Sequence, residues 1–564
     1  MQEKPIIYQV FTRLFGANST KCIPNGSRKE NGCGHMNDFT GAALAEIKEL
    51  GATHIWYTGL IEHATMSDYS EYGIRLDHPA IVKGRAGSPY AIKDYYDIDP
   101  DLANKVNERF KEYENLVNRT HKAGLKMIID FVPNHVARQY HSDAKPFDVR
   151  DFGEDDEPSW AFSTQNNFYY LPGTKFSPNF DLDDPQMGRY EETPCKATGN
   201  DCFTPWVSRN DWYETVKLNY GVDYQGDHQM AFSPSTPDTW LKMRDILLFW
   251  AGTGVDGFRC DMAEMVPVDF WGWAIPQVKS QYPEVIFIAE VYNPHEYRNY
   301  IMRGKFDYLY DKVGLYDTLR SVMGGQSASL ITGCWQAVED IQRHMLNFLE
   351  NHDEQRIASR FFAGNAEKGK PALLVSALMN TNPMMVYFGQ ELGEPGMDAE
   401  GFSGEDGRTT IFDYWTVDKI RRWRNGGKLD GKLLTDEEKA LRHYYDKVLR
   451  MCNKDKAIRE GQFFDIMYAN YDNELMDTNK LYAFLRKAGK ELILVVANFS
   501  DTPQRTWVKI PAHAFDVLGI PTLTEKTRCK ELLTHSFEKH ILVPDGTTYL
   551  EVPANGGKVL KFTL

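Results

Sequence analysis

The chain has 564 residues, more than one hydrophobic core usually supports, so two or three domains are expected. Its 79 acidic residues outnumber the 64 basic ones, and the net charge of −15 argues against nucleic acid or an anionic membrane as a partner. No apolar run reaches the length of about 18 residues that a membrane-spanning helix needs, so no membrane span is predicted.

Eight short, strand-like runs precede residue 390, and most of them are separated by helix-like segments. The runs cover residues 6–11, 54–58, 126–131, 255–259, 285–290, 306–309, 345–349 and 384–388. The clearest helical spacing of apolar residues lies at 40–50, 105–123 and 237–250. Alternating strands and helices favour a parallel sheet, and eight such units predict an α/β fold closed into a (β/α)8 TIM barrel.

Two regions depart from this alternation. About a hundred residues rich in Asp, Pro, Asn, Tyr and Trp follow the third run, too many for a loop inside a compact domain. Beyond a helical stretch at 435–453, short alternating strands are expected at 481–485, 492–499, 506–510, 548–552 and 558–564. We therefore predict a barrel (1–135 and 233–455), an inserted subdomain after the third strand (136–232) and a C-terminal all-β sandwich (456–564).

Polar side chains end four of the strand-like runs, at residues 130–135, 257–261, 286–290 and 348–353. In a parallel barrel the carboxyl ends of the strands meet on one face, which is where such barrels carry out chemistry. Three carboxyls, those of Asp261, Glu290 and Asp353, would therefore meet in one site. The alternative, unrelated polar caps at strand ends, would require several coincidences in a fixed order.

Three carboxyls on one face suit the cleavage of a glycosidic bond with retention of configuration. That reaction needs a nucleophilic carboxylate and a second carboxyl that acts as acid and then as base. Arg259 lies two residues before Asp261, on the same side of a strand, and is expected to orient that carboxylate and keep it ionised. A purely structural ion pair is the alternative for these two residues. Asp130 lies within its strand and is expected to anchor the loop that follows.

These motifs make the chain similar to the α-amylase family, glycoside hydrolase family 13, over essentially its whole length. The resemblance implies that Asp261 is the nucleophile, Glu290 the general acid/base and Asp353 the stabiliser of the transition state. It also implies that the sugar at the cleavage point is bound by Arg259, His135, His352 and Tyr90. Tyr90, from the segment 88–90, would stack on that sugar, although packing in the core is an alternative for its ring.

Departures from the family pattern concern metal binding and the leaving-group side. Glu264 and Met265 stand where typical α-amylases carry Lys and His, and Lys217 stands where calcium-dependent members place Asp. Asn134 is kept, as in members with and without the ion. We therefore expect no metal at the usual interdomain calcium position and no required cofactor. The Lys217 ammonium would fill that space or extend into solvent, and calcium elsewhere stays open.

The resemblance predicts a retaining hydrolase whose partner is an α-glucan, cleaving α-1,4 bonds of starch, glycogen or maltooligosaccharides. One alternative is a glucanotransferase or sugar isomerase of the same family, which forms the same covalent intermediate. A second is a catalytically inactive glucan-binding homologue, which is disfavoured because all three carboxylates are present.

The eight cysteines bear on the cellular compartment. Cys22 and Cys33 bracket one short polar loop, and Cys195 and Cys202 bracket another, which is typical of disulfides and an oxidising compartment. No signal peptide precedes Pro5. The expectation is a periplasmic or secreted protein whose leader was removed, or otherwise a cytoplasmic one. No Cys/His spacing predicts a zinc site.

Overall fold

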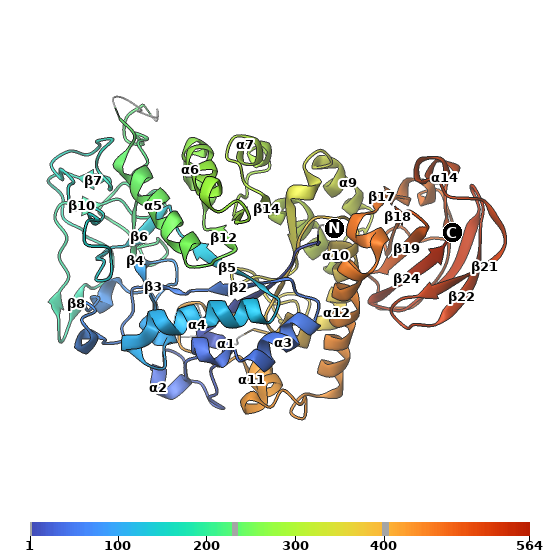
Figure 1. Cartoon of the computed structure of the whole chain (residues 1–564), viewed down its shortest axis with the longest axis horizontal. Helices are drawn as coiled ribbons and strands as arrows, with labels where there is room; N and C mark the ends of the chain where they lie inside the picture. The colour runs from blue at the N-terminus through green and yellow to red at the C-terminus, as the bar shows by residue number, and fades with distance from the viewer. Residues whose placement is uncertain (1–2, 228–234, 397–404) are drawn as a thin grey trace.

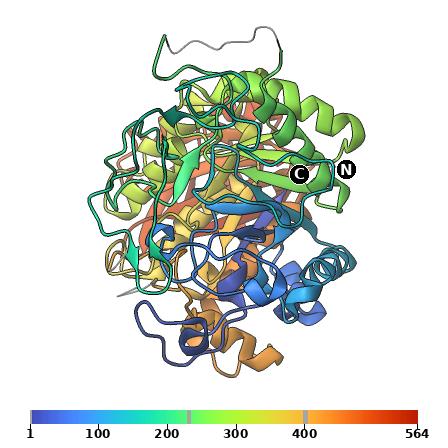
Figure 2. The ribbon, with the colours of Figure 1, turned by 90° about the vertical axis from the view of Figure 1, so that its left-hand side faces the viewer.

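The computed structural model describes residues 3–227, 235–396 and 405–564, so the last five residues of the predicted inserted subdomain lie outside the described residues. A barrel occupies the middle of the molecule (Figure 1). A loop-rich segment that contains β7 (Tyr170–Leu171), β8 (Asp183–Asp184) and β10 (Cys195–Lys196) lies at one end, and a β-domain lies at the other. Figure 2 looks onto the loop-rich end, with the barrel behind it.

The predicted barrel is confirmed. Its eight parallel strands are β1 (Ile6–Phe11), β2 (His54–Thr58), β5 (Lys126–Phe131), β12 (Gly257–Cys260), β13 (Ile286–Ala289), β14 (Tyr308–Tyr310), β15 (Met345–Phe348) and β16 (Met384–Tyr387). Closure is made by β1, which pairs with β2 on one side and with β16 on the other, so that Ile6 lies opposite Met384. The sixth strand begins two residues later than the predicted run at 306–309.

Helices of the barrel connect these strands and surround them. They are α3 (Gly41–Glu49), α4 (Arg109–Lys122), α5 (Asp238–Gly252), α6 (Val268–Gln281), α7 (Tyr297–Met302), α8 (Asp317–Met323), α9 (Leu330–Ala337) and α10 (Gly369–Leu378). Shorter or later ones are α1 (Thr12–Phe15), α2 (Arg28–Asn31), α11 (Asp418–Arg424), α12 (Asp436–Lys454) and α13 (Lys456–Glu460). Thr40 caps α3 by accepting a hydrogen bond from the Ala43 amide, and Gly51 ends it with a positive φ of 109°.

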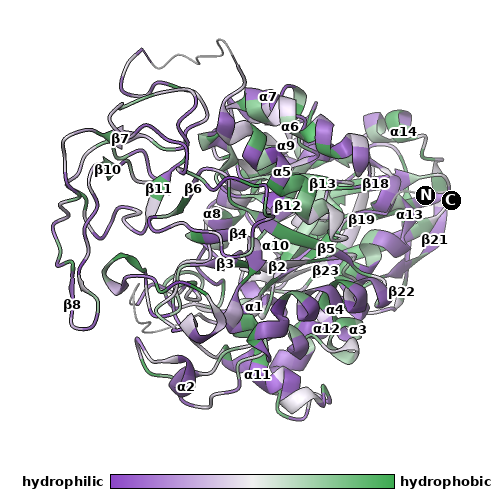
Figure 3. Cartoon of the chain, turned by 60° about the vertical axis from the view of Figure 1, so that its left-hand side comes forward, coloured by the Kyte–Doolittle hydropathy of each residue, from purple (hydrophilic) through white to green (hydrophobic). Residues whose placement is uncertain are grey.

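Side chains fill the inside of the barrel, which is therefore a packed core and not a channel. Ile7, Trp56, Ile128, Leu346 and Phe348 form one buried cluster there. Figure 3 shows hydrophobic residues on the strands, whereas hydrophilic residues are frequent on the outer helices α4 and α12. This packing leaves the carboxyl ends of the strands as the place where polar side chains collect.

The segment between β5 and β12 is mostly irregular. It contains β6 (His135–Ala137), β7 (Tyr170–Leu171), β8 (Asp183–Asp184), β9 (Gly188–Arg189), β10 (Cys195–Lys196) and β11 (Thr215–Lys217). The antiparallel pair β6–β11 places Lys217 opposite His135, which ties the end of this segment to the polar end of the third barrel strand. Before it, β3 (Ile61–His63) and β4 (Ile92–Ile98) form a further two-stranded sheet. The boundaries 136–232 of an inserted subdomain stay a prediction.

The disulfides expected from the cysteine spacing are wrong, because all eight cysteines, each within the described residues, are free thiols. The first loop is closed by the Asn31 side chain instead, which accepts from the Ile23 amide (2.9 Å) and donates to the Ile23 carbonyl (2.8 Å). Cys195 lies in β10, which is held by its backbone pairing with β7. In both regions, hydrogen bonds hold the chain where the cysteine spacing had suggested disulfide bonds.

The C-terminal β-domain is also confirmed. Its strands are β17 (Gln462–Asp465), β18 (Leu481–Ala488), β19 (Glu491–Asn498), β20 (Gln504–Lys509), β21 (Leu523–Glu531), β22 (Phe537–Leu542), β23 (Thr547–Val552) and β24 (Gly556–Thr563), with helix α14 (Ala512–Leu518). Six form an antiparallel sheet in the order β17-β18-β19-β24-β21-β22, and β20 pairs with β23. The boundary at 456 stays a prediction. Over the described ranges, no helix has both the length and the apolar character needed to cross a bilayer.

Candidate active site

Five of the seven predicted site residues line one cavity of about 350 Å³. They are Tyr90, His135, Asp261, Glu290 and Asp353. The other two, Arg259 and His352, are buried behind the cavity wall and hydrogen-bonded to residues that form it. The structure therefore brings together all the residues that the sequence placed in one site.

Arg259 lies at the centre of the site and is completely buried. Its Nη1 lies 2.8 Å from Asp261 Oδ1, and its Nη2 lies 2.8 Å from Glu290 Oε2. The adjacent parallel strands β12 and β13 end just before Asp261 and Glu290, with Cys260 opposite Ala289. Alternation along β12 turns Arg259 and Asp261 to the same side. One guanidinium fork thus holds carboxyls from two neighbouring strands.

Asp130 belongs to this network, so the expectation that it only anchors the following loop is wrong. Residue 130 lies opposite Arg259 in the parallel pairing of β5 and β12. Its carboxyl accepts a hydrogen bond from the Trp56 indole (3.0 Å) and lies 3.4 Å from Arg259 Nη1 and 3.4 Å from the Tyr90 hydroxyl. Burial raises the pKa of Asp130 to about 6.

Tyr90 and His352 form a stacked pair beside Asp353. Their ring centroids are 5.3 Å apart at 25°, and the Tyr90 hydroxyl lies 2.5 Å from His352 Nε2. The same nitrogen is 3.3 Å from Asp353 Oδ2, while Nδ1 lies 2.9 Å from the Gln9 amide nitrogen. Burial and the charge of Arg259 lower the pKa of His352 well below its usual range, so the ring is neutral. Asp353 is the most open of the three carboxyls, with 39% of its side chain exposed.

His135 forms the wall of the cavity towards the loop-rich segment. Its ring centroid lies 5.2 Å from that of Trp212, and its Nδ1 lies 3.1 Å from Asn134 Nδ2. Burial and the nearby ammonium of Lys217 lower the pKa of His135 to about 3. Both histidines of the site are therefore neutral hydrogen-bonding groups at ordinary pH.

Sequence reasoning missed Tyr292, Trp212 and Arg408, which also line the cavity. The Tyr292 hydroxyl donates to Glu290 Oε1 (2.6 Å), while the Met262 amide donates to Glu290 Oε2 (2.8 Å). Of these three residues, only Tyr292 could have been predicted from the sequence, because it stands two residues after Glu290 at the end of the same strand-like run. Trp212 and Arg408 come from irregular segments, where no periodicity indicates which side chains face the cavity.

The ionisation expected for Asp261 needs correction. Arg259 was expected to keep this carboxyl charged, but burial raises the pKa of Asp261 well above its usual range. The guanidinium lowers it, while the negative charges of Glu290 and Asp130 add to the rise. Desolvation and the neighbouring anions therefore outweigh the favourable ion pair with Arg259.

Lys217 is buried, which excludes the alternative of a side chain extending into solvent. Its Nζ lies 2.7 Å from Asn134 Oδ1 and 2.6 Å from Asp201 Oδ1, and 5.2 Å from the centroid of the Tyr224 ring. Burial lowers the pKa of Lys217, and the charge of Asp201 opposes this effect. The ammonium therefore joins the loop after the third barrel strand to two parts of the loop-rich segment.

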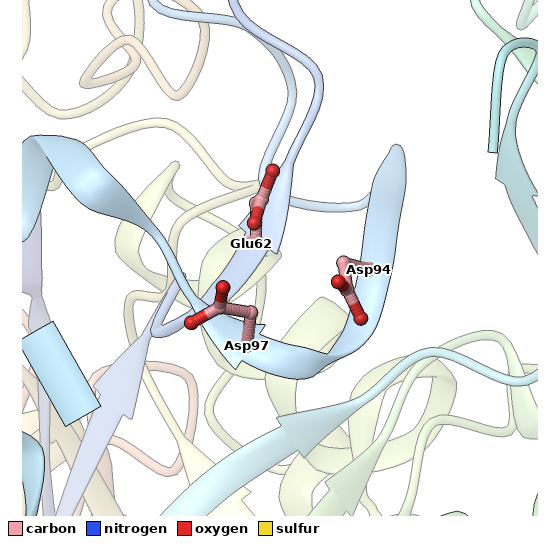
Figure 4. A group of neighbouring side chains, drawn as sticks. All are labelled: Glu62, Asp94 and Asp97. Carbon is pink, nitrogen blue, oxygen red and sulfur yellow. The ribbon is translucent and has the colours of Figure 1, made fainter. Parts of the chain in front are cut away.

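A second group of carboxyls, Glu62, Asp94 and Asp97, does not line the cavity. Figure 4 shows the three side chains near one another. Each offers an oxygen within 4.8 Å of the others, a spacing that could hold a metal ion. Protein groups already engage them: Asp97 accepts from Arg109 Nε (2.9 Å), and Asp94 accepts from backbone amides and the Ser142 hydroxyl (2.6 Å). Burial raises the pKa of Glu62, which favours its uncharged form. We therefore interpret these three carboxyls as part of a buried network of ion pairs and hydrogen bonds within the protein.

The chain is similar to known proteins over most of its length. The family model described as alpha amylase, catalytic domain, matches residues 9–460. Neopullulanase 2 of Thermoactinomyces vulgaris is 21% identical over 524 residues, which span 90% of this chain and 72% of that protein. Alpha-amylase 3 of Dictyoglomus thermophilum is 23% identical over 404 residues, 66% of this chain and 68% of the relative. The solved structure of the alpha-amylase from Geobacillus thermoleovorans, complexed with acarbose, superposes with a TM-score of 0.64 at 18% identity, covering 100% of both chains. Because the family match covers most of its length, the chain belongs to the α-amylase family of glycoside hydrolases.

Proposed function

We propose that this chain is a retaining hydrolase that cleaves α-1,4-glucosidic bonds of starch, glycogen or maltooligosaccharides through a covalent glycosyl-enzyme. The observation that supports it most is the guanidinium of Arg259, which holds Asp261 and Glu290 side by side in a cavity that Asp353 also lines. Retention requires two closely spaced carboxyls with different roles. Family relatives with amylase and pullulanase names are consistent with an α-glucan substrate.

In the proposed first step, a carboxylate oxygen of Asp261 bonds to the anomeric carbon of the sugar. The bond from that carbon to the glycosidic oxygen breaks, and the Glu290 carboxyl gives its proton to the leaving oxygen. In the second step, water attacks the anomeric carbon, its proton passes to Glu290, and the bond to Asp261 breaks. Asp353 would stabilise the positive charge that develops on the ring in both steps.

The remaining residues would bind and orient the sugar. Neutral His135 and His352 can donate to or accept from hydroxyl groups, and Tyr90, whose ring is held by its stack on His352, would stack on the sugar. Arg259 is fully buried and lies 2.8 Å from both carboxyls, so we assign it the positioning of Asp261 and Glu290, in addition to the sugar contact that the family resemblance implies. These groups would fix the anomeric carbon between the two working carboxyls.

The test is to follow maltoheptaose by proton NMR and by product chromatography. Retention should release the new reducing end first as the α-anomer, and hydrolysis should give only shorter sugars. A β-anomer as first product would contradict the proposed mechanism. Products longer than the substrate would favour the glucanotransferase alternative, and no reaction would favour an inactive glucan-binding protein.

One prediction concerns the acid side of the pH profile. Because the anion of Asp130 helps to raise the pKa of Asp261, Asp130→Asn should lower that pKa. The nucleophile is active when ionised, so kcat/KM rises as pH increases through its pKa. In the variant this acid limb should move to lower pH by about 0.5–1 unit. An unchanged limb, measured on maltoheptaose between pH 4 and 8, would show that Asp130 does not influence the group that titrates.

A second prediction follows from the buried ammonium of Lys217. We propose that it replaces the calcium ion that the family often holds between Asn134 and the inserted segment, because a fixed positive charge repels a divalent cation. Dialysis against a strong chelator should leave both activity and melting temperature unchanged. Activity lost on chelation and restored by micromolar calcium would contradict the proposal.

The same proposal predicts the effect of removing the charge. Lys217→Met should cost about 1–3 kcal/mol of stability, because the carbonyl of Asn134 loses a buried hydrogen bond whereas the half-exposed Asp201 can be hydrated. Lys196→Met is a suitable control, because this nearby lysine is only partly buried. Calorimetry should show a clear fall in melting temperature for Lys217→Met and a smaller one for the control.

A further inference from the structure

A groove of about 860 Å³ lies between the barrel and the C-terminal β-domain, away from the catalytic cavity. One wall comes from α9 and the turn after it, and the other from β17, the turn after β17 and helix α14. Figure 1 shows α9 next to β17, at the end of the barrel away from the loop-rich segment. The groove shares no lining residue with the catalytic cavity. It is larger than that cavity and has no place in the mechanism described above.

Aromatic rings contributed by both domains line the groove, namely Trp335, Phe463, Phe464 and Tyr468. The Trp335 indole donates to Asp465 Oδ2 (2.8 Å), and its ring meets Phe463 edge-to-face at 5.3 Å. Asp465 also accepts from the Thr332 hydroxyl (2.7 Å) and the Tyr482 hydroxyl (2.9 Å). The tryptophan is therefore held in a fixed orientation across the domain boundary by a carboxyl that is itself fully hydrogen-bonded.

The opposite side of the groove is more open. Tyr468 is 50% exposed, and Phe464 packs against the ring of His513 with centroids 5.4 Å apart. The groove is also lined by amide side chains and by charges of both signs, including Gln336, Glu339 and Arg343. Rings offer faces to apolar surfaces, and these side chains offer both donors and acceptors. The lining thus suits an uncharged ligand with apolar faces and many hydroxyl groups.

We propose that this groove is a second carbohydrate-binding site, which holds a segment of α-glucan chain while another part of the same polymer occupies the catalytic cavity. The choice of ligand rests on the proposed function, but the groove itself does not. A polymer bound at two sites meets the second at high effective concentration. The site should therefore strengthen binding of long glucans and leave the cleavage of short ones unchanged.

The test compares two tyrosines of almost equal exposure. Tyr468 (50% exposed) lines the groove, whereas Tyr471 (48% exposed), three residues later, does not. Each is changed to alanine in the full chain, alone and, for Tyr468, together with His513→Ala. Binding to insoluble starch is measured in an Asp261→Asn background, which prevents digestion, and kcat/KM on maltotriose is measured in the active background.

Tyr468→Ala should weaken starch binding about tenfold, the double variant more, and Tyr471→Ala not measurably. Maltotriose kinetics and melting temperatures should stay the same in all variants. Starch binding by Tyr468→Ala and the double variant that equals that of Tyr471→Ala would overturn the proposal. Failure of the proposed function is distinct, because the wild type would then cleave neither maltotriose nor starch whatever the groove variants bind.

Discussion

Replacing Asp261 by asparagine should reduce kcat/KM on maltooligosaccharides by several orders of magnitude. The change keeps the volume of the side chain but removes the oxygen anion that would bond to the anomeric carbon. Stability should change little, because Arg259 keeps Glu290 and Asp130 as counter-ions. The substitution also removes the electrostatic repulsion between the carboxylate at position 261 and those of Glu290, Asp130 and Asp353. Initial rates and melting temperatures of both proteins provide the measurement.

Asp311 offers a matched control for this substitution. It directly follows β14, as Asp261 directly follows β12, and it is also buried, with a pKa raised to about 6 by burial. Its carboxyl accepts from the Leu315 amide (2.8 Å) and does not line the catalytic cavity. Asp311→Asn should keep most of the activity. If Asp261→Asn kept more than about a tenth of the wild-type rate, the assignment of the nucleophile would be wrong.

Replacing Arg259 by methionine should have the largest effect on stability. It leaves Asp130, Asp261 and Glu290 buried together without their shared cation, which costs about 3–5 kcal/mol. Without the guanidinium, which lowers both values, the pKa values of Asp130 and Asp261 would rise further above those of the unfolded chain. A raised pKa makes the ionised form destabilising above that value, so the loss of stability should shrink as pH falls from 7 towards 4. Activity should be abolished.

Arg259→Lys separates the charge of this residue from its geometry. Lysine keeps a positive charge but offers one ammonium in place of a planar fork, so it cannot lie within 3 Å of both carboxyls as the two guanidinium nitrogens do. We expect a smaller fall in melting temperature than for methionine, together with a loss of at least about a hundredfold in kcat/KM. Equal melting temperatures for wild type and Arg259→Met at pH 7 would contradict the central position of this ion cluster.

The fold could be predicted from the sequence where apolar periodicity was strong. The eight barrel strands were found because each is a short run buried on both faces. The strands β17, β21 and β22 were missed because each buries only one or two of its residues. For example, β21 reads LTEKTRCKE and buries only two of its nine residues, so its pairing with β24 and β22, not its own sequence, makes it a strand.

The candidate site was predictable in its members but not in its interactions. Asp261 and Arg259 could be placed on one side of a strand from their spacing. The position of Asp130 opposite Arg259, by contrast, depends on the register between β5 and β12, which one strand does not reveal. The raised pKa of Asp261 likewise depends on how deeply several carboxyls are buried together. For the cysteines, the hydrogen bonds of Asn31 closed a loop whose spacing alone suggested a covalent link.

The pairing of β1 with β16 has a consequence for how the chain is made. Ile6 leaves the ribosome early, but its partner Met384 follows nearly four hundred residues later. At translation rates of about 5–20 residues per second, the barrel stays open for tens of seconds. During that time β1 and the most recently made strand both present unpaired backbone edges, which readily join edges of other chains. Nascent or truncated chains that end before β16 should therefore depend on chaperones, or aggregate, far more than the finished protein does.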